Sequence, residues 1–416
     1  MTKEKSTVPR LRFPGFTDAW KQRKLGEVAD FSIKTNSLSR DKLSSYFYEV
    51  QNIHYGDILT KYDAILDVCN KELPSIIGST ISDFVDALLI EGDIVFADAA
   101  EDSTVGKAVE VRNFKGKNVV SGLHTIVARP KVSYAPYYLG YLINSTAYHN
   151  QILPLMQGTK VSSISKANLK STTVVFPTLP EQEVIGSFFS DLDQLITLHQ
   201  RKLDDVKELK KALLQKMFPK GNGNDFPELR FPEFTDAWKQ RKLGEYFVER
   251  LECSAEGELL SVTISDGVRR FSELDRKDNS SEDKTKYKVL KQGDIVYNSM
   301  RMWQGASGYS IYDGIVSPAY TVLIPTYLSY ALFFSYLFKR SSSLQIFQVN
   351  SQGLTSDTWN LKYKPFSNIV FPAPTLPEQE AIGSFFSDLD QLITLHQRQL
   401  DHLKLLKKAL LQQMFI

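Results

Sequence analysis

The chain has 416 residues, of which 42% are hydrophobic and 12% aromatic, so it can bury substantial cores and is not an intrinsically disordered protein. Its formal net charge of +2 lacks the basic excess of a dedicated nucleic-acid binder, and its two cysteines exclude a disulfide framework and a cysteine zinc site. The longest apolar run, residues 326–338, is shorter than the roughly 20 residues of a membrane span, and no signal-peptide core precedes it, so we expect a cytoplasmic, non-membrane protein with a buried helix in that run.

Two segments of the chain occur twice. Residues 9–28 return as residues 227–246 with 3 of 20 positions changed. Residues 178–218 return as residues 375–415 with 6 of 41 positions changed, whereas almost nothing between the repeats matches. The chain is therefore two copies of one unit, in which an opening motif and a long closing segment frame a divergent insert. A constant frame with two different inserts favours a protein that recognises two different targets.

The first insert, residues 30–175, carries its charges in two blocks. Residues 57–102 hold eleven acidic side chains and two lysines, whereas residues 103–170 hold nine basic side chains and a single acidic one, Glu110. This asymmetry is typical of a domain with a phosphate-facing side opposite an acidic side that faces a partner. An ordinary solvated surface is the alternative.

The long repeated segments have the pattern of helices. Pro180 suits a first helical turn, glutamates follow it, and lysines gather near the other end of the segment. Apolar residues recur about every 3.5 positions, as in a coiled coil. About 37 residues form a rod of roughly 55 Å, whose apolar stripe needs a partner stripe. The flexible linker at residues 219–226 and the second insert, residues 247–370, leave room for the second helix to run antiparallel to the first.

These elements predict an α/β fold class, with two globular mixed α/β domains joined by two long antiparallel coiled-coil helices in a pseudo-two-fold arrangement. The expected boundaries, in chain order, are residues 1–177 for the first domain with its opening motif, 178–218 for the first helix, 219–226 for the linker, 227–374 for the second domain with its opening motif, and 375–416 for the second helix.

Motifs that mark catalytic chemistry are missing from the sequence. It contains no phosphate-binding GxxxxGK[ST] loop, no HExxH, no GxSxG and no glycine fingerprint between a strand and a helix. An adenine methyltransferase would also need an (N/D)PP(Y/F) segment, which is absent. We therefore expect a binding and scaffolding protein without cofactor, metal site or catalytic residues.

The repeated motifs follow a recognisable pattern. The opening motifs have the form FPxFxxxWxxxxLGE, and the repeated helices begin LPEQExIGxFFxxLDxLI. Each insert also has a GDI-type strand, at residues 92–96 and 293–297. A Val-Ser turn is expected later in each insert, at residues 120–121 and 316–317. Over the full chain, this pattern resembles that of the specificity subunits of type I restriction-modification systems.

The resemblance implies a function and a set of partners. Each insert would be a target-recognition domain that reads one half of a bipartite, asymmetric site in double-stranded DNA, while the helix pair sets the spacer. Two methyltransferase subunits and two restriction-translocase subunits would do the chemistry, so none is implied for this chain. The dyad of duplex DNA suits two readers related by two-fold symmetry.

Two other functions remain open at this point. An architectural or regulatory protein that bridges DNA without a restriction partner would share the fold and the basic surface. A fused methyltransferase-endonuclease is the third possibility, and the missing motifs disfavour it.

In the second insert, residues 297–308 gather hydrogen-bond donors and an aromatic ring in a glycine-bounded loop. Arg301 has the donors to bridge guanine edges, and Asn298 or Gln304 can pair with adenine. The segment also contains Trp303. The alternative is that Trp303 and Met302 pack inside the domain while Arg301 forms a salt bridge.

Each insert has a polar loop near its end, at residues 157–168 and 350–360. Amide and hydroxyl side chains in such loops suit contact with a DNA groove, although the same composition is common in plain turns. The candidate DNA contacts in these loops are Gln157, Thr159, Lys160, Ser162, Asn350 and Gln352.

Four further candidates lie elsewhere in the inserts. His54 and Tyr55, in the segment NIHYGDI, resemble a recognition-domain segment and are predicted to lie on the DNA side. Lys107 belongs to the basic block of the first insert, and Lys286 belongs to the run KTKYKVLK in the second. Both lysines are candidates for phosphate contact, with a solvated surface as the alternative.

Both opening motifs contain the basic sequence KQRK, at residues 21–24 and 239–242. Because the sequence is constant, it cannot specify two different half-sites. Contact with the DNA backbone or docking to the methyltransferase is the expected role, and structural capping of the module is the alternative.

Overall fold

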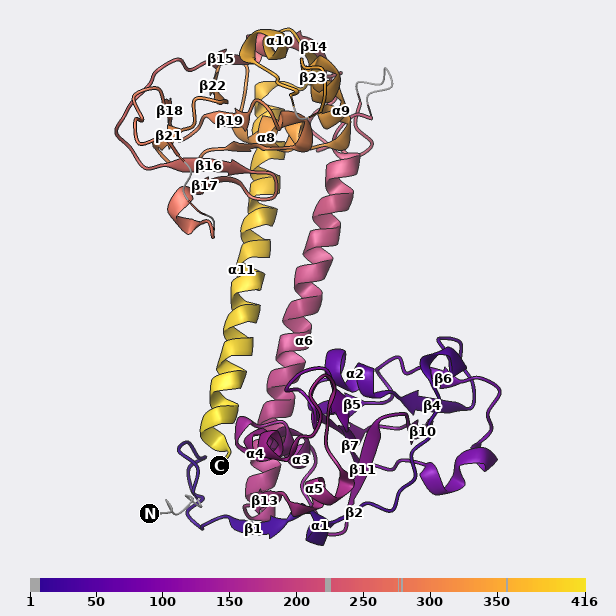
Figure 1. Ribbon diagram of the computed structural model, residues 1–416. Helices are drawn as coiled ribbons and strands as arrows, with labels where there is room; N and C mark the ends of the chain where they lie inside the picture. Colours follow the sequence, from indigo (N-terminus) through magenta and orange to yellow (C-terminus); the bar gives the residue numbers. More distant parts are fainter. Residues whose placement is uncertain (1–7, 221–225, 276, 278–279, 357) are drawn as a thin grey trace. The chain divides into compact units, whose positions relative to one another are not determined.

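Each insert folds together with its opening motif and with parts of the two long helices, α6 (Leu179–Lys216) and α11 (Leu376–Met414). The computed structural model describes residues 8–220, 226–275, 277, 280–356 and 358–416 (Figure 1). Unit 1 comprises the chain up to Gln200 together with Arg398–Ile416, and unit 2 comprises Arg201–Gln397. Unit 1 is thus completed by the last part of α11, which is distant in sequence, whereas unit 2 is one continuous stretch that begins within α6.

Unit 1 mixes short strands with short helices. The strands are β1 (Lys21–Lys24), β2 (Ala29–Asp30), β3 (Leu43–Ser44), β4 (Val50–Ile53), β5 (Ile65–Asp67), β6 (Ser75–Ile76), β7 (Ile94–Ala97), β8 (Ala99–Ala100), β9 (Ala108–Arg112), β10 (Asn118–Ser121), β11 (Thr125–Pro130), β12 (Ser162–Ser163) and β13 (Thr173–Phe176). The α-helices before α6 are α1 (Leu25–Val28), α2 (Tyr55–Thr60), α3 (Tyr138–Ile143), α4 (Thr146–Ile152) and α5 (Lys166–Ser171).

The largest sheet of unit 1 has the order β2-β11-β7-β9-β5, and only the β5–β9 pair in it is parallel. Strand β7 is buried along its whole length, which agrees with its run of apolar residues. A second sheet has the order β10-β4-β6-β3, and the constant strand β1 pairs with β13 at the end of the insert. One apolar cluster joins the main sheet, α3, α4 and the start of α6.

Unit 2 has strands and short helices as well, with fewer strands in its main sheet and, among the described residues, no α-helix at the place of α2. The strands are β14 (Lys239–Lys242), β15 (Phe247–Glu249), β16 (Leu260–Thr263), β17 (Gly267–Arg270), β18 (Lys288–Leu290), β19 (Ile295–Asn298), β20 (Ser307–Tyr309), β21 (Gly314–Val316), β22 (Tyr320–Pro325) and β23 (Val370–Ala373). The helices before α11 are α7 (Leu243–Tyr246), α8 (Ala331–Phe338), α9 (Ser341–Asn350) and α10 (Tyr363–Ser367).

The main sheet of unit 2 has the order β15-β22-β19-β20, and all its pairs are antiparallel. This order corresponds to β2-β11-β7-β9 in unit 1, because the GDI-type strands β7 and β19 hold equivalent places. The constant strand β14 pairs with β23, as β1 pairs with β13. The two divergent inserts therefore fold on a common scaffold.

A buried carboxylate at the start of α6 holds the first opening motif. Glu181 is fully buried and accepts hydrogen bonds from Arg12 at 2.6 and 2.7 Å. The Trp20 indole N–H also donates to Glu181, at 3.4 Å. Unit 2 repeats this arrangement with Glu378 and Arg230, whose two bonds are both 2.7 Å long. The opening motif and the helix are thus joined by the same ion pair in both units.

The far end of the other long helix closes each core. In unit 1, Phe415 stacks on Phe189, with ring centroids 6.0 Å apart, and packs edge-on against Trp20. In unit 2, Phe218 stacks in the same way on Phe386 at 6.0 Å. Because the start of one long helix meets the end of the other in each unit, the helix segments run antiparallel. The predicted fold class is confirmed.

Of the predictions for individual segments, one is confirmed and one is wrong. The predicted buried helix in the apolar run is confirmed as α8, which buries both of its central phenylalanines. The predicted Val-Ser turn is wrong for Val120–Ser121, which is the end of β10, where parallel pairing with β4 continues through Ser121. In the second copy Val316 is likewise the last residue of β21. No helix in the described ranges is long and apolar enough to cross a membrane.

We expect Arg12→Met to destabilise unit 1 by about 3–5 kcal/mol, because it leaves the carboxylate of Glu181 buried without its cation. Urea unfolding of the full chain, followed by hydrogen exchange in unit 1, measures the loss. Lys34→Met is the matched control, since it breaks an ion pair with Asp86 whose side chains are 72% and 75% exposed. That control should change stability by no more than about 1 kcal/mol. Equal effects of the two substitutions would contradict the anchoring role of Glu181.

Candidate nucleic-acid interface

In unit 1, the polar loop near the end of the insert is fixed to the segment that follows β7. Strand β12 pairs with β8, and the Ile164 amide donates to the Asp98 carbonyl at 2.8 Å. Gln157 and Ser163 exchange backbone hydrogen bonds of 2.9 and 2.8 Å, which close the loop into a hairpin. The loop therefore projects from the end of a buried strand.

Unit 2 holds the polar loop near the end of its own insert in the same way. The Leu361 amide donates to the Ser299 carbonyl at 2.8 Å, and Gln352 and Asn360 exchange backbone hydrogen bonds of 3.0 and 2.8 Å. Asp98 and Ser299 stand at the same place after their GDI motifs. The two loops thus have equivalent positions on the scaffold, although their sequences differ beyond the shared Gln-Gly at the start.

The shared glycines have a conformational reason. Gly158 has a φ of +105°, and a Cβ there would lie 2.1 Å from the Val161 carbonyl oxygen. Gly353 has a φ of +148°, and a Cβ there would lie 2.6 Å from the Thr358 carbonyl oxygen. Both loops turn so tightly that only glycine fits.

The hairpin loops present several of the predicted contacts to solvent. Gln157, Thr159 and Lys160 are exposed in the loop of unit 1, and Ser162 is partly buried in β12. Gln352 is exposed in the loop of unit 2. Asn350 is exposed as well, but it belongs to the last turn of α9, where its amide group donates to the Ile346 carbonyl at 2.8 Å.

The loop after β19 lies beside the hairpin of unit 2. Trp303 packs edge-on against Trp359, with ring centroids 5.1 Å apart, and its N–H donates to the Met300 carbonyl at 3.1 Å. Met302 is fully buried, as the structural alternative expected. Trp303 therefore supports the hairpin while remaining partly exposed, and its contact with DNA stays a prediction.

Polar side chains in the same loop remain accessible. Arg301 is exposed, and its guanidinium donates to the uncharged side-chain amide oxygen of Gln304 at 3.2 Å. Among the described residues Arg301 forms no ion pair, which goes against the salt-bridge alternative. Asn298, at the end of β19, accepts a hydrogen bond from the Met300 amide at 3.0 Å through its side-chain oxygen. The nitrogen of the same side-chain amide can donate a hydrogen bond.

In unit 1, a ring cluster joins the segment of His54 to the hairpin. Tyr55 lies between His54, at a centroid distance of 4.7 Å, and His124, at 5.3 Å. The His124 imidazole pairs with the Asp98 carboxylate at 3.3 Å, and its carbonyl accepts from the Asp98 amide at 3.0 Å. The chain therefore brings His54, Tyr55 and the polar hairpin of unit 1 together around Asp98.

His124 is a site residue that sequence reasoning missed. It is about half exposed, and its φ of +54° is an unusual backbone conformation for a residue other than glycine. Strained backbone of this kind gathers at functional sites. The sequence gives no signal for it, because the strain arises from the turn between β10 and β11.

Burial determines the proton equilibria of this cluster. His54 is buried and caps α2, where its Nδ1 accepts from the Gly56 amide at 3.1 Å. Burial lowers the pKa of His54, and the charge of Arg40 lowers it further, whereas Asp57 opposes the shift. Burial raises the pKa of Asp98, and His124 opposes that shift. His54 is therefore a neutral structural cap, and Tyr55 and His124 form the accessible part of the cluster.

The two predicted phosphate-binding lysines form no hydrogen bond or ion pair with the described residues of the hairpins. The Lys107 ammonium is half-buried and donates to the Leu59 carbonyl at 3.1 Å, and burial lowers its pKa. Lys286 is exposed in the segment before β18. The structure does not bring either lysine to the polar loops.

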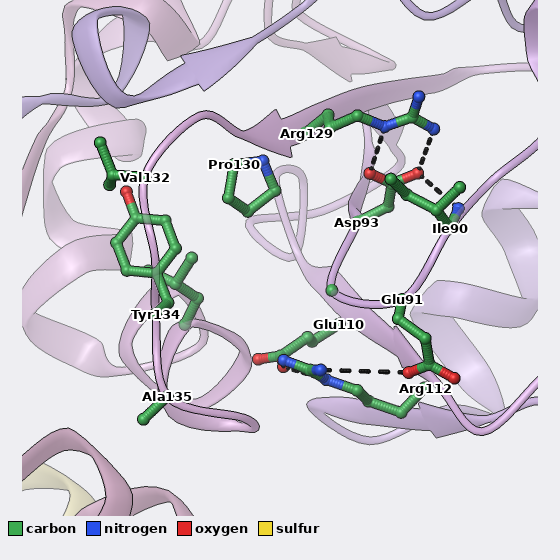
Figure 2. Close-up of a pocket in the computed structure, with 12 residues that line it drawn as sticks. Ile90, Glu91, Asp93, Glu110, Arg112, Arg129, Pro130, Val132, Tyr134 and Ala135 are labelled. Carbon is green, nitrogen blue, oxygen red and sulfur yellow. Dashed lines mark hydrogen bonds and ion pairs between the residues drawn. The ribbon is translucent and has the colours of Figure 1, made fainter. Parts of the chain in front are cut away.

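A cavity of about 200 Å³ in unit 1 contains a different group of charges (Figure 2). Arg129 donates to both carboxylate oxygens of Asp93, at 2.7 and 2.8 Å, and Arg112 donates to Glu110 at 2.6 Å. Arg112 also approaches Glu91, at 3.9 Å. Each cation in the cavity therefore already has a carboxylate partner.

These pairs have a structural role. Glu110 is almost fully buried and accepts from the amides of Tyr137 and Gly140, both at 2.8 Å, so it fixes the start of α3. Unit 2 repeats the other pair as Arg250 and Asp294. The charged groups around this cavity thus connect the main sheet of unit 1 to α3. No group of His, Cys, Asp and Glu side chains in the described part of the chain is arranged to hold a metal ion.

The chain matches the family described as "type I restriction modification DNA specificity domain" over residues 17–208 and 260–405, and it belongs to that family. Two curated relatives come from Methanocaldococcus jannaschii. The type I restriction enzyme MjaVIII specificity subunit is 24% identical over 279 residues, which are 61% of this chain and 64% of the relative. A protein named as the MjaX specificity subunit is 25% identical over 237 residues, which are 55% of this chain and 53% of the relative.

The chain thus spans about half to two thirds of the length of these relatives. Among solved structures, the S subunit of a type I restriction-modification system from M. genitalium has a similar fold. Its TM-score is 0.58 at 15% identity, and the match covers 98% of this chain and 99% of that one.

We predict that His54 makes stability depend on pH. A histidine whose folded pKa lies below its unfolded value of about 6.5 takes up a proton on unfolding, so its presence costs stability as the pH falls below about 6.5. His54→Asn keeps a capping oxygen but cannot titrate. The stability of the wild type relative to this variant should therefore fall between pH 7.5 and pH 5.5. The raised pKa of Asp98 acts in the opposite direction, with stability lost as the pH rises, and it is present in both proteins. A constant difference between the two proteins would contradict the prediction.

Proposed function

We propose that the chain is the DNA-specificity subunit of a type I restriction-modification complex and that each unit reads one half of a bipartite site in double-stranded DNA. The observation that carries this proposal is the equivalence of the two hairpin loops. They stand at the same place on a common scaffold but carry different side chains, as two readers of different half-sites require. Family membership supports the same function.

The readers in this proposal are the predicted target-recognition domains, residues 1–177 and 227–374. In unit 2, Arg301 would donate to base edges in the major groove, and Asn298 would pair with adenine. In unit 1, the side chains of Tyr55, His124 and the hairpin take that role. Half-site specificity would then depend on loops that the scaffold holds rigidly.

The chemistry in this proposal belongs to other subunits. Two methyltransferase subunits and two restriction-translocase subunits would assemble on the chain, which contributes no catalytic residue of its own. The long helices, residues 178–218 and 375–416, would hold the readers at a fixed spacing. The names of the curated relatives, which are specificity subunits of type I restriction enzymes, support this assignment.

Genome-wide mapping of methylated adenines tests the function directly. A host that expresses the chain with a type I methyltransferase subunit should methylate one bipartite, asymmetric sequence, and omission of the chain should abolish this methylation. A chain that binds and bridges DNA without directing any methylation would instead be the architectural protein considered above.

The two loop glycines allow each reader to be tested separately. Gly158→Ala should weaken recognition of one half-site, and Gly353→Ala should weaken recognition of the other, because the added Cβ collides with the backbone across its own loop. We expect losses of about 1–3 kcal/mol in binding, the size of one lost base contact. Gly116→Ala is the matched control, since Gly116 also has a positive φ of +82° but no atom near the added Cβ.

Competition binding by the assembled complex, with DNA altered in one half-site at a time, gives the measurement. Loss of both half-sites from a single substitution would show that the loops are not independent readers. If neither glycine variant affected binding while both remained folded, the loops would not be the contact surface.

A further inference from the structure

Unit 2 contains a large basic groove that is separate from the reader loops. It has a volume of about 1030 Å³ and lies between α6, the β16–β17 hairpin and the end of α8. Its lining includes two carboxylates, Asp266 and Asp390. Against these stand six cationic side chains: Lys207, Lys210, Lys211, Arg269, Lys339 and Arg340.

Few of these cations are neutralised within the chain. Lys210 pairs with Asp390, which also accepts the Tyr336 hydroxyl at 2.7 Å. Lys339 and Arg340 donate only to neutral backbone carbonyls, at 2.8 and 3.0 Å, and neither forms an ion pair with a described residue. The groove therefore keeps a clear excess of positive charge.

Burial makes this excess of positive charge unfavourable. Lys339 and Arg340 are both partly buried, and burial lowers the pKa of each. The Nε of Arg269 is buried and has no hydrogen-bond partner among the described residues, although its guanidinium also pairs with Glu273 at 3.1 Å. A cation or donor that is withdrawn from water without a partner is destabilising, and a bound anion removes that cost.

The same motif recurs in unit 1, although the insert there is unrelated in sequence. Lys107 donates to the Leu59 carbonyl at 3.1 Å, as Lys339 does to the Ile264 carbonyl. Burial is the main cause that lowers the pKa of both lysines, and Asp63 opposes the shift of Lys107 as Asp266 opposes that of Lys339. The charge of Lys407 on α11 lowers the pKa of Lys107 further, and the charge of the equivalent Lys210 on α6 does the same for Lys339. Two different inserts thus each place a half-buried lysine against a constant lysine of a long helix.

The donors in the groove suit a polyanion of repeating charge. Lys207 and Lys211 are exposed on α6, one turn apart, or about 6 Å along the helix axis. Neither forms an ion pair with a described residue. Ser335 and Thr394 line the same space, with hydroxyls that donate to the Leu332 and Asp390 carbonyls at 2.6 and 2.8 Å and can still accept a hydrogen bond. Lysine ammonium groups are common donors to DNA phosphates.

We propose that this groove binds the DNA phosphate backbone next to the half-site read by unit 2, independently of base sequence. This inference rests on the proposed function. The lysines of α6 belong to the repeated frame, which is the same for different inserts, so they are suited to supply affinity and cannot supply sequence choice. Contacts of this kind release counterions and make binding depend on salt.

The test uses the chain assembled with its methyltransferase subunits and the double variant Lys207→Gln/Lys211→Gln. Affinity is measured by fluorescence anisotropy between 50 and 300 mM salt, with cognate DNA and with DNA whose half-sites are scrambled. The variant should bind both DNAs more weakly by the same factor. The log–log salt slope should fall by about 1.8, or about 0.9 for each lost phosphate contact.

The matched control is Lys202→Gln/Lys216→Gln, which removes two charges from exposed positions of the same helix outside the groove. It should leave the slope nearly unchanged. All four positions are exposed, so both variants should fold, and circular dichroism checks this.

Three results would overturn the proposal. An unchanged salt slope in the groove variant would exclude phosphate contact, while a retained preference for cognate DNA would leave the proposed function intact. Loss of methyltransferase assembly would show that the groove docks a protein. A loss of affinity confined to cognate DNA would show that the lysines read sequence.

If even the wild type failed to prefer cognate DNA, the proposed function would fail, and the salt slope would still decide the role of the groove.

Discussion

The rest of the structure depends on a buried carboxylate at the first turn of each long helix. Glu181 and Glu378 are almost completely withdrawn from solvent, and each is held by an arginine and a tryptophan from the opening motif. Such a carboxylate is tolerable only while its cation and its hydrogen bonds are in place. This requirement ties the opening motif to the helix, and the motif in turn places the constant strand that pairs with the end of each insert.

The frame accepts different inserts because it requires only a few contacts from each insert. In both units a tyrosine from the helix after the main sheet donates to an aspartate of a long helix at 2.7 Å, as Tyr141 does to Asp193 and Tyr336 to Asp390. The glutamine beside each buried glutamate accepts from an insert backbone amide, which any residue except proline supplies. Most of the remaining insert surface is therefore free to differ, including the hairpin loops that are fixed to the segments after the buried strands β7 and β19.

The sequence predicted those parts of the structure that depend on local pattern or on repetition. The long helices follow from apolar spacing, and the GDI-type strands follow from buried apolar runs. The site was less predictable. The sequence predicts polar loops at residues 157–168 and 350–360, but their equivalence depends on pairing across the fold, with Asp98 and Ser299. No local pattern contains that pairing. His124 was missed for the same reason, since its strain and its contact with Tyr55 exist only in the folded unit.

The arrangement separates two physical tasks that a DNA reader must perform. Hydrogen bonds to base edges discriminate between sequences, but they act only after the duplex is held at the correct distance and angle. Phosphate contacts hold the duplex, yet they are blind to sequence and weaken with salt. In the proposed mechanism the reader loops belong to the divergent inserts, whereas part of the groove belongs to the constant helices α6 and α11. A change of insert then alters discrimination, while much of the sequence-independent affinity stays with the frame. In both inserts of this chain a half-buried lysine lies near a constant lysine of a long helix, Lys107 near Lys407 and Lys339 near Lys210, so two unrelated inserts supply positive charge at the same place on the frame.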